Sequence, residues 1–281
     1  MLNISGRIDK DTVSLCQVVK NAADKLDIPF VLVGASARDI ILHHAHGVRI
    51  DRATVDVDIG IQVPDWSAFS ELKNALVRSG FSATDIQHRL ISPSNLKLDI
   101  VPFGNVQNSG TNICWPPDGE KIMNVLGFQE ACDNAEKVRL QEEPPVDIPV
   151  ATPAGLALLK IIAWTDRQYN QRKNDAMDLY YLIDTYESIP AINERIFSNE
   201  NLMSNYGWDS KLAGAYLLGK DAKAIAAEET KRFVQDLFDV KIDKLNPELL
   251  VEDMCHRIDW EFERKNPLFE AFIDGFESSN P

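Results

Sequence analysis

Apolar and polar residues repeat with two different periods in the first half of the chain. A repeat of three or four residues predicts amphipathic helices, whereas strict alternation or a short apolar run predicts strands. In chain order, we expect a helix at 11–26, a strand at 29–34, a helix at 35–44, a strand at 54–63, a helix at 66–80 and a strand at 96–103. This order predicts an α+β domain built on a small mixed sheet with flanking helices.

The second half of the chain shows a different pattern. Residues 104–150 are rich in loop signals, including WPPDG and EEPPVDIP, and the strand signals end there. Thr152 is suited to cap a helix and Pro153 to occupy its first turn. TPAGLALLKIIAWTDR, NDAMDLYYLIDTY, AAEETKRFVQDLF and the tail all have helical periodicity. We therefore expect two domains, 1–150 and an all-helical 151–281.

Composition and charge narrow the function classes. The chain has 281 residues, 44% of them hydrophobic, and a formal net charge of -14, which excludes general electrostatic attraction to nucleic acid and requires any RNA contact to be local. Its four cysteines form no CxxC pair, so neither a disulfide framework nor a zinc knuckle is indicated. Without a secretory leader or an apolar run of roughly 18 residues, we expect a soluble, cytoplasmic protein.

The strand TVDVDIGIQV places Asp56 and Asp58 on one face, two residues apart, where their like charges repel each other. The strand LKLDIVPF contains Asp99. If these strands are neighbours, three carboxylates converge, and Mg²⁺ or Mn²⁺ prefers such oxygen ligands. Two such ions would activate an attacking hydroxyl and stabilise leaving pyrophosphate. A solvated strand face is the alternative interpretation of the aspartate pair.

The segment VLVGASARDI runs from a strand through Gly34 into a helix start. Small residues let the backbone approach a ligand, and helix N-terminal amides favour phosphate oxygens. Ser36 adds a hydroxyl, and Arg38 lies one turn further on. Together with the aspartates, this turn predicts a nucleoside triphosphate site.

These residues resemble the signature of the DNA polymerase β nucleotidyltransferase superfamily: Gly34, Ala35 and Ser36, then Asp56 and Asp58, then Asp99. The ARD of residues 37–39 is also similar to a turn in the head domain of tRNA CCA-adding enzymes. Two features depart from the superfamily pattern. An insertion around HHAHGVRIDR lengthens the spacing from Ser36 to Asp56, and Ala35 replaces the more usual glycine or serine.

In the helical half, LALLKIIAWTDR and RKNDAMDLYYL resemble motifs of AbiEii/AbiGii toxin-like nucleotidyltransferases, and the resemblance extends to about residue 190. It implies a nucleotide-phosphate role for Lys160 and makes Asp175 and Asp178 candidates for a further active-site acid. The residues themselves support part of this, because Lys160 lies in a helix that is apolar almost all round and a buried lysine must be paired or functional. A structural pair between Lys160 and an aspartate is the alternative.

Several other residues are weaker candidates for metal or nucleotide binding. His43, His44 and His46 invite a metal interpretation, but they lie at a predicted helix end where cationic rings suit the helix dipole. Arg49 and Arg52 would meet a triphosphate or form surface ion pairs. Trp115 would stack on a base or seal a core edge.

We therefore predict a nucleotidyltransferase with two Mg²⁺ ions that transfers a nucleoside monophosphate from an NTP to an acceptor hydroxyl. By resemblance, the acceptor is a tRNA 3′ end or a protein side chain, and the setting is a toxin-antitoxin pair with a cognate antitoxin. In this scheme Asp56, Asp58 and Asp99 hold metal, and Gly34, Ser36, Arg38 and Lys160 bind the nucleotide. The alternatives are a non-catalytic protein that keeps the fold and, ranked lower, a DxD glycosyltransferase using Mn²⁺.

Overall fold

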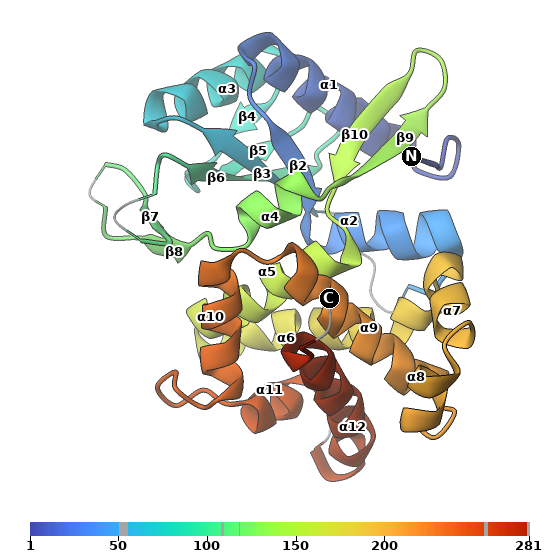
Figure 1. Cartoon of the computed structure of the whole chain (residues 1–281). Helices are drawn as coiled ribbons and strands as arrows, with labels where there is room; N and C mark the ends of the chain where they lie inside the picture. Colours follow the sequence, from blue (N-terminus) through green and yellow to red (C-terminus); the bar gives the residue numbers. More distant parts are fainter. Residues whose placement is uncertain (51–55, 108–109, 118, 256–257, 280–281) are drawn as a thin grey trace. The chain divides into compact units, whose positions relative to one another are not determined.

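The protein consists of two compact units, Met1–Thr152 and Pro153–Pro281 (Figure 1). The computed structural model describes residues 1–50, 56–107, 110–117, 119–255 and 258–279. The first unit combines a mixed sheet with helices, and the described part of the second is helical. The predicted fold class is confirmed.

Among the described residues, one sheet of eight strands forms the centre of the first unit, in the order β1-β9-β10-β2-β3-β6-β5-β4. At its middle, β3 runs antiparallel to β2 and parallel to β6. The strands are β1 (Leu2–Asn3), β2 (Phe30–Val33), β3 (Asp56–Val63), β4 (Ser82–Ala83), β5 (Arg89–Ile91), β6 (Lys97–Gly104), β9 (Glu136–Gln141) and β10 (Val146–Val150). A separate pair joins β7 (Asn112–Cys114) to β8 (Ile122–Asn124).

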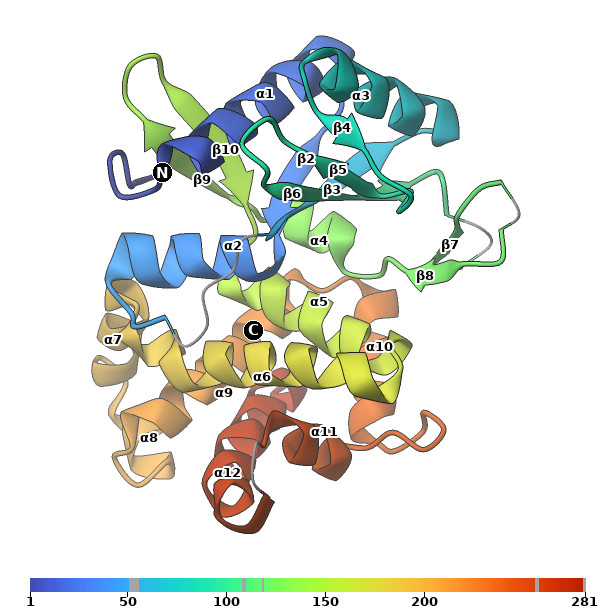
Figure 2. The same cartoon turned by 180° about the vertical axis from the view of Figure 1, so that it is seen from behind.

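The helices α1 (Lys10–Leu26) and α3 (Trp66–Arg78) pack side by side on one face of this sheet (Figures 1 and 2). Successive side chains of β3 point to opposite faces of the sheet. Val57, Ile59, Ile61 and Val63 are buried, whereas the intervening positions, including Asp56 and Asp58, point to the opposite face. The helices α2 (Gly34–Asp39) and α4 (Phe128–Asp133) contact β3, and Gln129 of α4 accepts a hydrogen bond from Gln62 at 2.9 Å. The aspartates therefore lie on the face of the sheet opposite α1 and α3.

Residues 104–150 differ from the loop-rich segment predicted from the sequence. They contain β7, β8, α4, β9 and β10, and the last two extend the main sheet. Val138 and Leu140 of β9 and Ile148 of β10 are buried. The prolines around EEPP lie in the turn between these strands, outside their apolar alternation. The loop prediction was wrong because the turn signals outweighed two short alternating runs.

The second unit is built from α5 (Pro153–Asp166), α6 (Tyr169–Thr185), α7 (Pro190–Phe197), α8 (Glu200–Asn205), α9 (Ser210–Ile225), α10 (Glu228–Phe238), α11 (Pro247–Met254) and α12 (Ile258–Glu277). The closest approach is between α9 and α12. A Cβ on Gly219 would lie 1.9 Å from the backbone oxygen of Phe272, and one on Gly275 would lie 1.9 Å from that of Tyr216. Only glycine at both positions permits this backbone contact.

The helix α5 is apolar on nearly every side because other helices of its unit surround it. It contacts α6, α9 and α10. Its Trp164 donates a 3.0 Å hydrogen bond to buried Asp253 of α11, which also receives one from Arg172 of α6 at 2.6 Å. This shared carboxylate ties three helices together and gives the buried indole N–H its partner.

Candidate functional site

Asp56 and Asp58 lie together on the face of β3 opposite α1 and α3, and the sequence predicted that they share one face. Asp58 faces Val33 of β2 on one side and Asp99 of β6 on the other. Because β3 and β6 are parallel and in register, the side chains of Asp58 and Asp99 share one face of the sheet. The structure thus brings all three predicted aspartates to neighbouring positions on one face.

Gly34 packs directly against Asp58. Its φ is +69°, a conformation that favours glycine, and a Cβ added here would lie 2.2 Å from Asp58 Oδ2. Ser36 Oγ, in the first turn of α2, donates a 2.7 Å hydrogen bond to the backbone oxygen of Asp56. The glycine turn and the aspartate strand are therefore one interlocked element.

Asp99 is held by a cation that sequence reasoning missed. Arg89 of β5 donates from Nε to Asp99 Oδ1 at 2.7 Å and from Nη2 to Oδ2 at 2.6 Å, a bidentate pair. The pKa of the Arg89 guanidinium is raised, chiefly by this hydrogen bonding and further by the charges of Asp99, Asp56 and Asp58. Arg89 therefore interacts electrostatically with all three carboxylates of Asp56, Asp58 and Asp99, which we call the acidic face.

A second cation contacts the other end of the face. Lys97 Nζ lies 3.3 Å from Asp56 Oδ1 as an ion pair, but its alignment does not make a hydrogen bond, and this oxygen is shielded from solvent without a hydrogen-bond partner. Lys97 could have been anticipated, because it shares a strand face with Asp99 two residues away. Arg89 could be suggested only by the hairpin signal of SPSN between RLI and LKLDI.

The fit of this face to a divalent cation differs among the three carboxylates. Asp56 offers a shielded oxygen that receives no hydrogen bond, and Asp58 is pressed against a glycine turn that has room for no side chain. Such oxygens suit a hard cation. Asp99 has both oxygens engaged by Arg89, and no group of three or more His, Cys, Asp or Glu side chains among the described residues is arranged to hold a metal ion. Of the three carboxylates, Asp56 therefore offers a cation an oxygen without a hydrogen bond, whereas Asp99 is bound by Arg89.

Arg38 has a buried carboxylate partner. Its Nε donates to Asp39 Oδ1 at 2.9 Å, its Nη2 lies 2.7 Å from the same oxygen, and both side chains are buried. The sequence assigned Arg38 to nucleotide binding. In this structure its guanidinium is bound to Asp39, so a contact with phosphate would require that pair to rearrange.

The predicted residues of the helical unit form one charged cluster. Lys160 Nζ donates to Asp175 Oδ1 at 3.0 Å and to Asp178 Oδ2 at 2.7 Å, and Arg167 Nη1 donates to Asp175 Oδ2 at 2.7 Å. Burial acts to lower the pKa of Lys160, but the charges of Asp175 and Asp178 hold it above its ordinary value. Lys160 is therefore a protonated ammonium. Both a phosphate contact and a structural ion pair require that charge.

His43 and Trp115, two further candidates from the sequence, have structural roles. His43 Nδ1 lies 2.7 Å from the backbone oxygen of Val48, and its ring is edge-on to His44. Trp115 is 1% exposed and packs against Trp66 and Phe69, so it seals a core edge instead of presenting a stacking surface. Arg52 lies outside the described residues.

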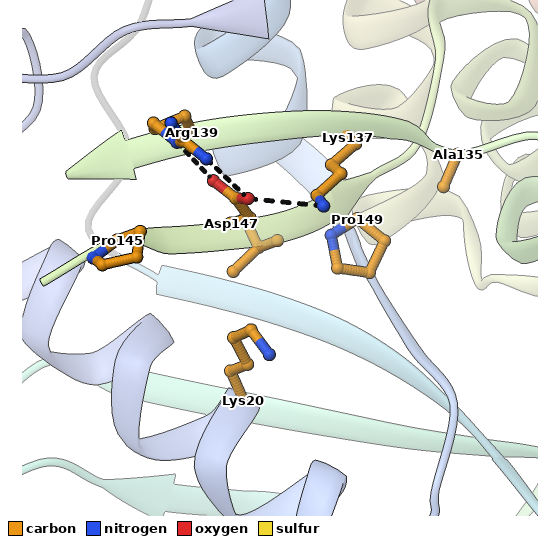
Figure 3. Close-up of a pocket in the computed structure, with 8 residues that line it drawn as sticks. Lys20, Ala135, Lys137, Arg139, Pro145, Asp147 and Pro149 are labelled. Carbon is orange, nitrogen blue, oxygen red and sulfur yellow. Dashed lines mark hydrogen bonds and ion pairs between the residues drawn. The ribbon is translucent and has the colours of Figure 1, made fainter. Parts of the chain in front are cut away.

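A cavity of about 430 Å³ lies between α1 and the hairpin of β9 and β10, lined in part by Lys20, Lys137, Arg139 and Asp147 (Figure 3). Each of its named cations already has a carboxylate partner. Asp147 accepts two hydrogen bonds from Arg139, at 2.7 and 3.1 Å, and lies 3.3 Å from Lys137. Lys20 pairs with Asp24. We therefore assign no ligand to this cavity.

The comparison with protein families shows the class of protein to which this chain belongs. The profile of the family described as "Nucleotidyl transferase AbiEii toxin, Type IV TA system" matches residues 18–265. The chain belongs to this family. The predicted enzyme class, a nucleotidyltransferase, is confirmed, and the glycosyltransferase alternative is not supported. No curated protein matches the chain.

Several solved structures have a chain path that can be aligned with this one. The antibiotic-resistance factor ANT(2″)-Ia has 15% identity, covers 81% of this chain and 96% of its own, and gives a TM-score of 0.39. An antigenic nucleotidyltransferase-like protein from Paracoccidioides brasiliensis has 16% identity, with coverages of 72% and 94% and a TM-score of 0.39. The Thermotoga maritima CCA-adding enzyme complexed with tRNA has 12% identity, coverages of 98% and 85%, and a TM-score of 0.26. These similarities are too distant to transfer a residue's role.

Proposed function

We propose that this protein is a Mg²⁺-dependent toxin that transfers a nucleoside monophosphate from an NTP to an acceptor hydroxyl. The observation that carries the proposal is the pairing of Asp56 and Asp58 on one strand face, locked against Gly34, with the shielded Oδ1 of Asp56 receiving no hydrogen bond. Family membership supports the reaction class.

In this proposal the aspartates would bind the metal, and the backbone of the glycine turn would bind phosphate. Asp56 and Asp58 would hold Mg²⁺, which when bound neutralises phosphate charge and acidifies an acceptor hydroxyl. The Gly34–Ser36 turn brings backbone close to the same aspartates, where an amide can meet a phosphate oxygen. Lys160 is a charged ammonium held by two aspartates of its own unit, and a phosphate contact requires that charge.

The reaction breaks a phosphoanhydride bond and forms a phosphate ester bond. The acceptor oxygen attacks the α-phosphorus as its proton leaves to a carboxylate of the site or to water. The bond between the α-phosphorus and the bridging oxygen breaks, and pyrophosphate departs. We propose either the 3′ end of an RNA such as tRNA or a protein side-chain hydroxyl as the acceptor, with the reaction restrained in the cell by an antitoxin.

No helix among the described residues combines the length and apolar character needed to cross a bilayer. The cytoplasmic location stays a prediction of the sequence.

The test is label transfer from each of the four α-labelled NTPs, with Mg²⁺ and a cell extract that supplies RNA and protein acceptors. Wild type should label a macromolecule, and Asp58→Asn should not. Asp147→Asn, which alters an aspartate on the same sheet outside the acidic face, should label normally. Sensitivity of the product to ribonuclease or to protease identifies the acceptor. Equal labelling by wild type and Asp58→Asn would refute the proposal.

A further inference from the structure

An exposed tyrosine of the helical unit lies among cations. Tyr169 is 63% exposed, the guanidinium carbon of Arg172 lies 5.0 Å from its ring centroid, and Nζ of Lys173 lies 5.2 Å from the same centroid. Residues 167–173 contain three cations and no acidic residue, in a chain whose net charge is -14. Because that net charge restricts any contact with RNA to a local surface, this segment is a candidate for one. We call Tyr169, Arg172 and Lys173 the aromatic–cationic surface.

The ring of Tyr169 packs against a guanidinium that is itself fixed. Arg172 donates from Nε to Asp253 at 2.6 Å, and its side chain is only 12% exposed. Its guanidinium carbon also lies 5.3 Å from the ring centroid of buried Trp164, which belongs to α5, the helix that packs beside α6 (Figure 2). Because a fixed side chain supports the ring of Tyr169, holding that ring in place for a ligand costs little conformational entropy.

The cations of this segment differ in how far carboxylates neutralise them. Arg167 and Arg172 each donate to a buried aspartate. Among the residues that the structure describes, Lys173 has no carboxylate partner, and its ammonium contacts the ring of Tyr169. The surface therefore combines an exposed ring with an uncompensated positive charge beside it.

This combination suits a single strand of nucleic acid, because a base stacks on an aromatic ring while a cation contacts the neighbouring phosphate. Every nucleotide carries both groups, whereas a protein acceptor would have to present an apolar group and an acid at the same spacing. We propose that the aromatic–cationic surface binds single-stranded RNA, with a base stacked on Tyr169 and a phosphate on Lys173. This inference rests on the proposed function, because it selects RNA from the two acceptors proposed there.

The experiment measures binding of the whole purified chain to a fluorescently labelled, unstructured RNA of about 12 nucleotides, by fluorescence anisotropy and without NTP. Tyr169→Ala should weaken binding at least about fivefold, because one base–aromatic stack is lost, whereas Tyr169→Phe keeps the ring and should bind within about twofold of wild type. Lys173→Gln should reduce the slope of log K against log salt by about 0.7, the value for one phosphate contact on a single strand.

Two residues of the same unit provide matched controls. Trp208 is similarly exposed, at 66%, but an acidic residue, Asp209, follows it in the chain, so Trp208→Ala should bind RNA like wild type. Lys241→Gln removes an exposed lysine that is paired with Asp239 at 2.7 Å and should leave the salt slope unchanged.

Equal RNA affinity of Tyr169→Ala and Trp208→Ala, with both variants folded by circular dichroism, would overturn the inference, as would a wild-type chain that does not bind the RNA. A ring that only covers Arg172 would give the first of these results together with a lower free energy of unfolding in Tyr169→Ala. Equally weak binding by Tyr169→Phe and Tyr169→Ala would contradict stacking. The proposed function fails separately, if Asp58→Asn still transfers label from an NTP.

Discussion

Replacing Gly34 with alanine tests how tightly the glycine turn and the aspartate strand are interlocked. The new Cβ would lie 2.2 Å from Asp58 Oδ2, closer than the 3.0 Å below which such contacts are not found. The carboxylate must therefore retreat by nearly an ångström. A misplacement of about 1 Å at reacting groups costs on the order of 10²-fold in rate, so we expect nucleotidyl transfer to fall by that factor.

The same substitution has a moderate effect on stability. A non-glycine residue at φ +69° costs about 1–2 kcal/mol, and moving Asp58 off its preferred rotamer adds about 1 kcal/mol. Gly6→Ala is the matched control, because Gly6 has φ +77° and nothing within 4 Å of the added Cβ. It should lose only the backbone contribution of about 1–2 kcal/mol and keep full activity.

The assay pairs label transfer with urea unfolding for both variants. If Gly34→Ala transfers label within about threefold of Gly6→Ala at equal folded fraction, the turn does not position Asp58.

Three further predictions concern stability, measured by urea or thermal unfolding. Trp164→Phe removes the indole donor to Asp253, whereas the Nε1 of Trp115 is buried without a hydrogen-bond partner. Trp164→Phe should therefore lower the free energy of unfolding by at least about 1 kcal/mol more than Trp115→Phe does. Equal losses in the two variants would contradict this. Lys160→Met removes the cation shared by buried Asp175 and Asp178 and should cost about 3–5 kcal/mol. Lys211→Met, which breaks an exposed pair, should cost under about 1 kcal/mol. Hydrogen bonding by Arg139 lowers the pKa of Asp147 to about 2, so the stabilisation is complete above about pH 4 and is lost as the pH falls through 2. Asp147→Asn should flatten this acid-sensitive range, and an unchanged acid profile would show that the pair contributes nothing.

Local sequence patterns were enough to predict the centre of the site. Alternation in TVDVDIGIQV places Asp56 and Asp58 on one face because a strand repeats every two residues. The strand-to-helix turn at Gly34 follows from the same local rules. The apolar surroundings of Lys160 likewise indicated a lysine that is either paired or functional, and the structure shows it paired with Asp175 and Asp178.

The missing parts depend on contacts between distant segments. Arg89 meets Asp99 through the register of β5 on β6, and no local period specifies a register between strands. The strands β9 and β10 were predicted as loop because a proline-rich turn separates two short runs. The binding of Arg38 to Asp39 depends on burial of both side chains, which the helical pattern of that segment does not determine.

Pyrophosphate release coupled to acceptor labelling tests the central claim most directly. Purified protein, an NTP, Mg²⁺ and the labelled fraction of the extract should release one pyrophosphate for each nucleoside monophosphate transferred. Asp56→Asn and Asp58→Asn should each abolish both signals, while Asp147→Asn retains both. Pyrophosphate release and label transfer that persist in both acidic-face variants would contradict the assignment of this reaction to Asp56 and Asp58.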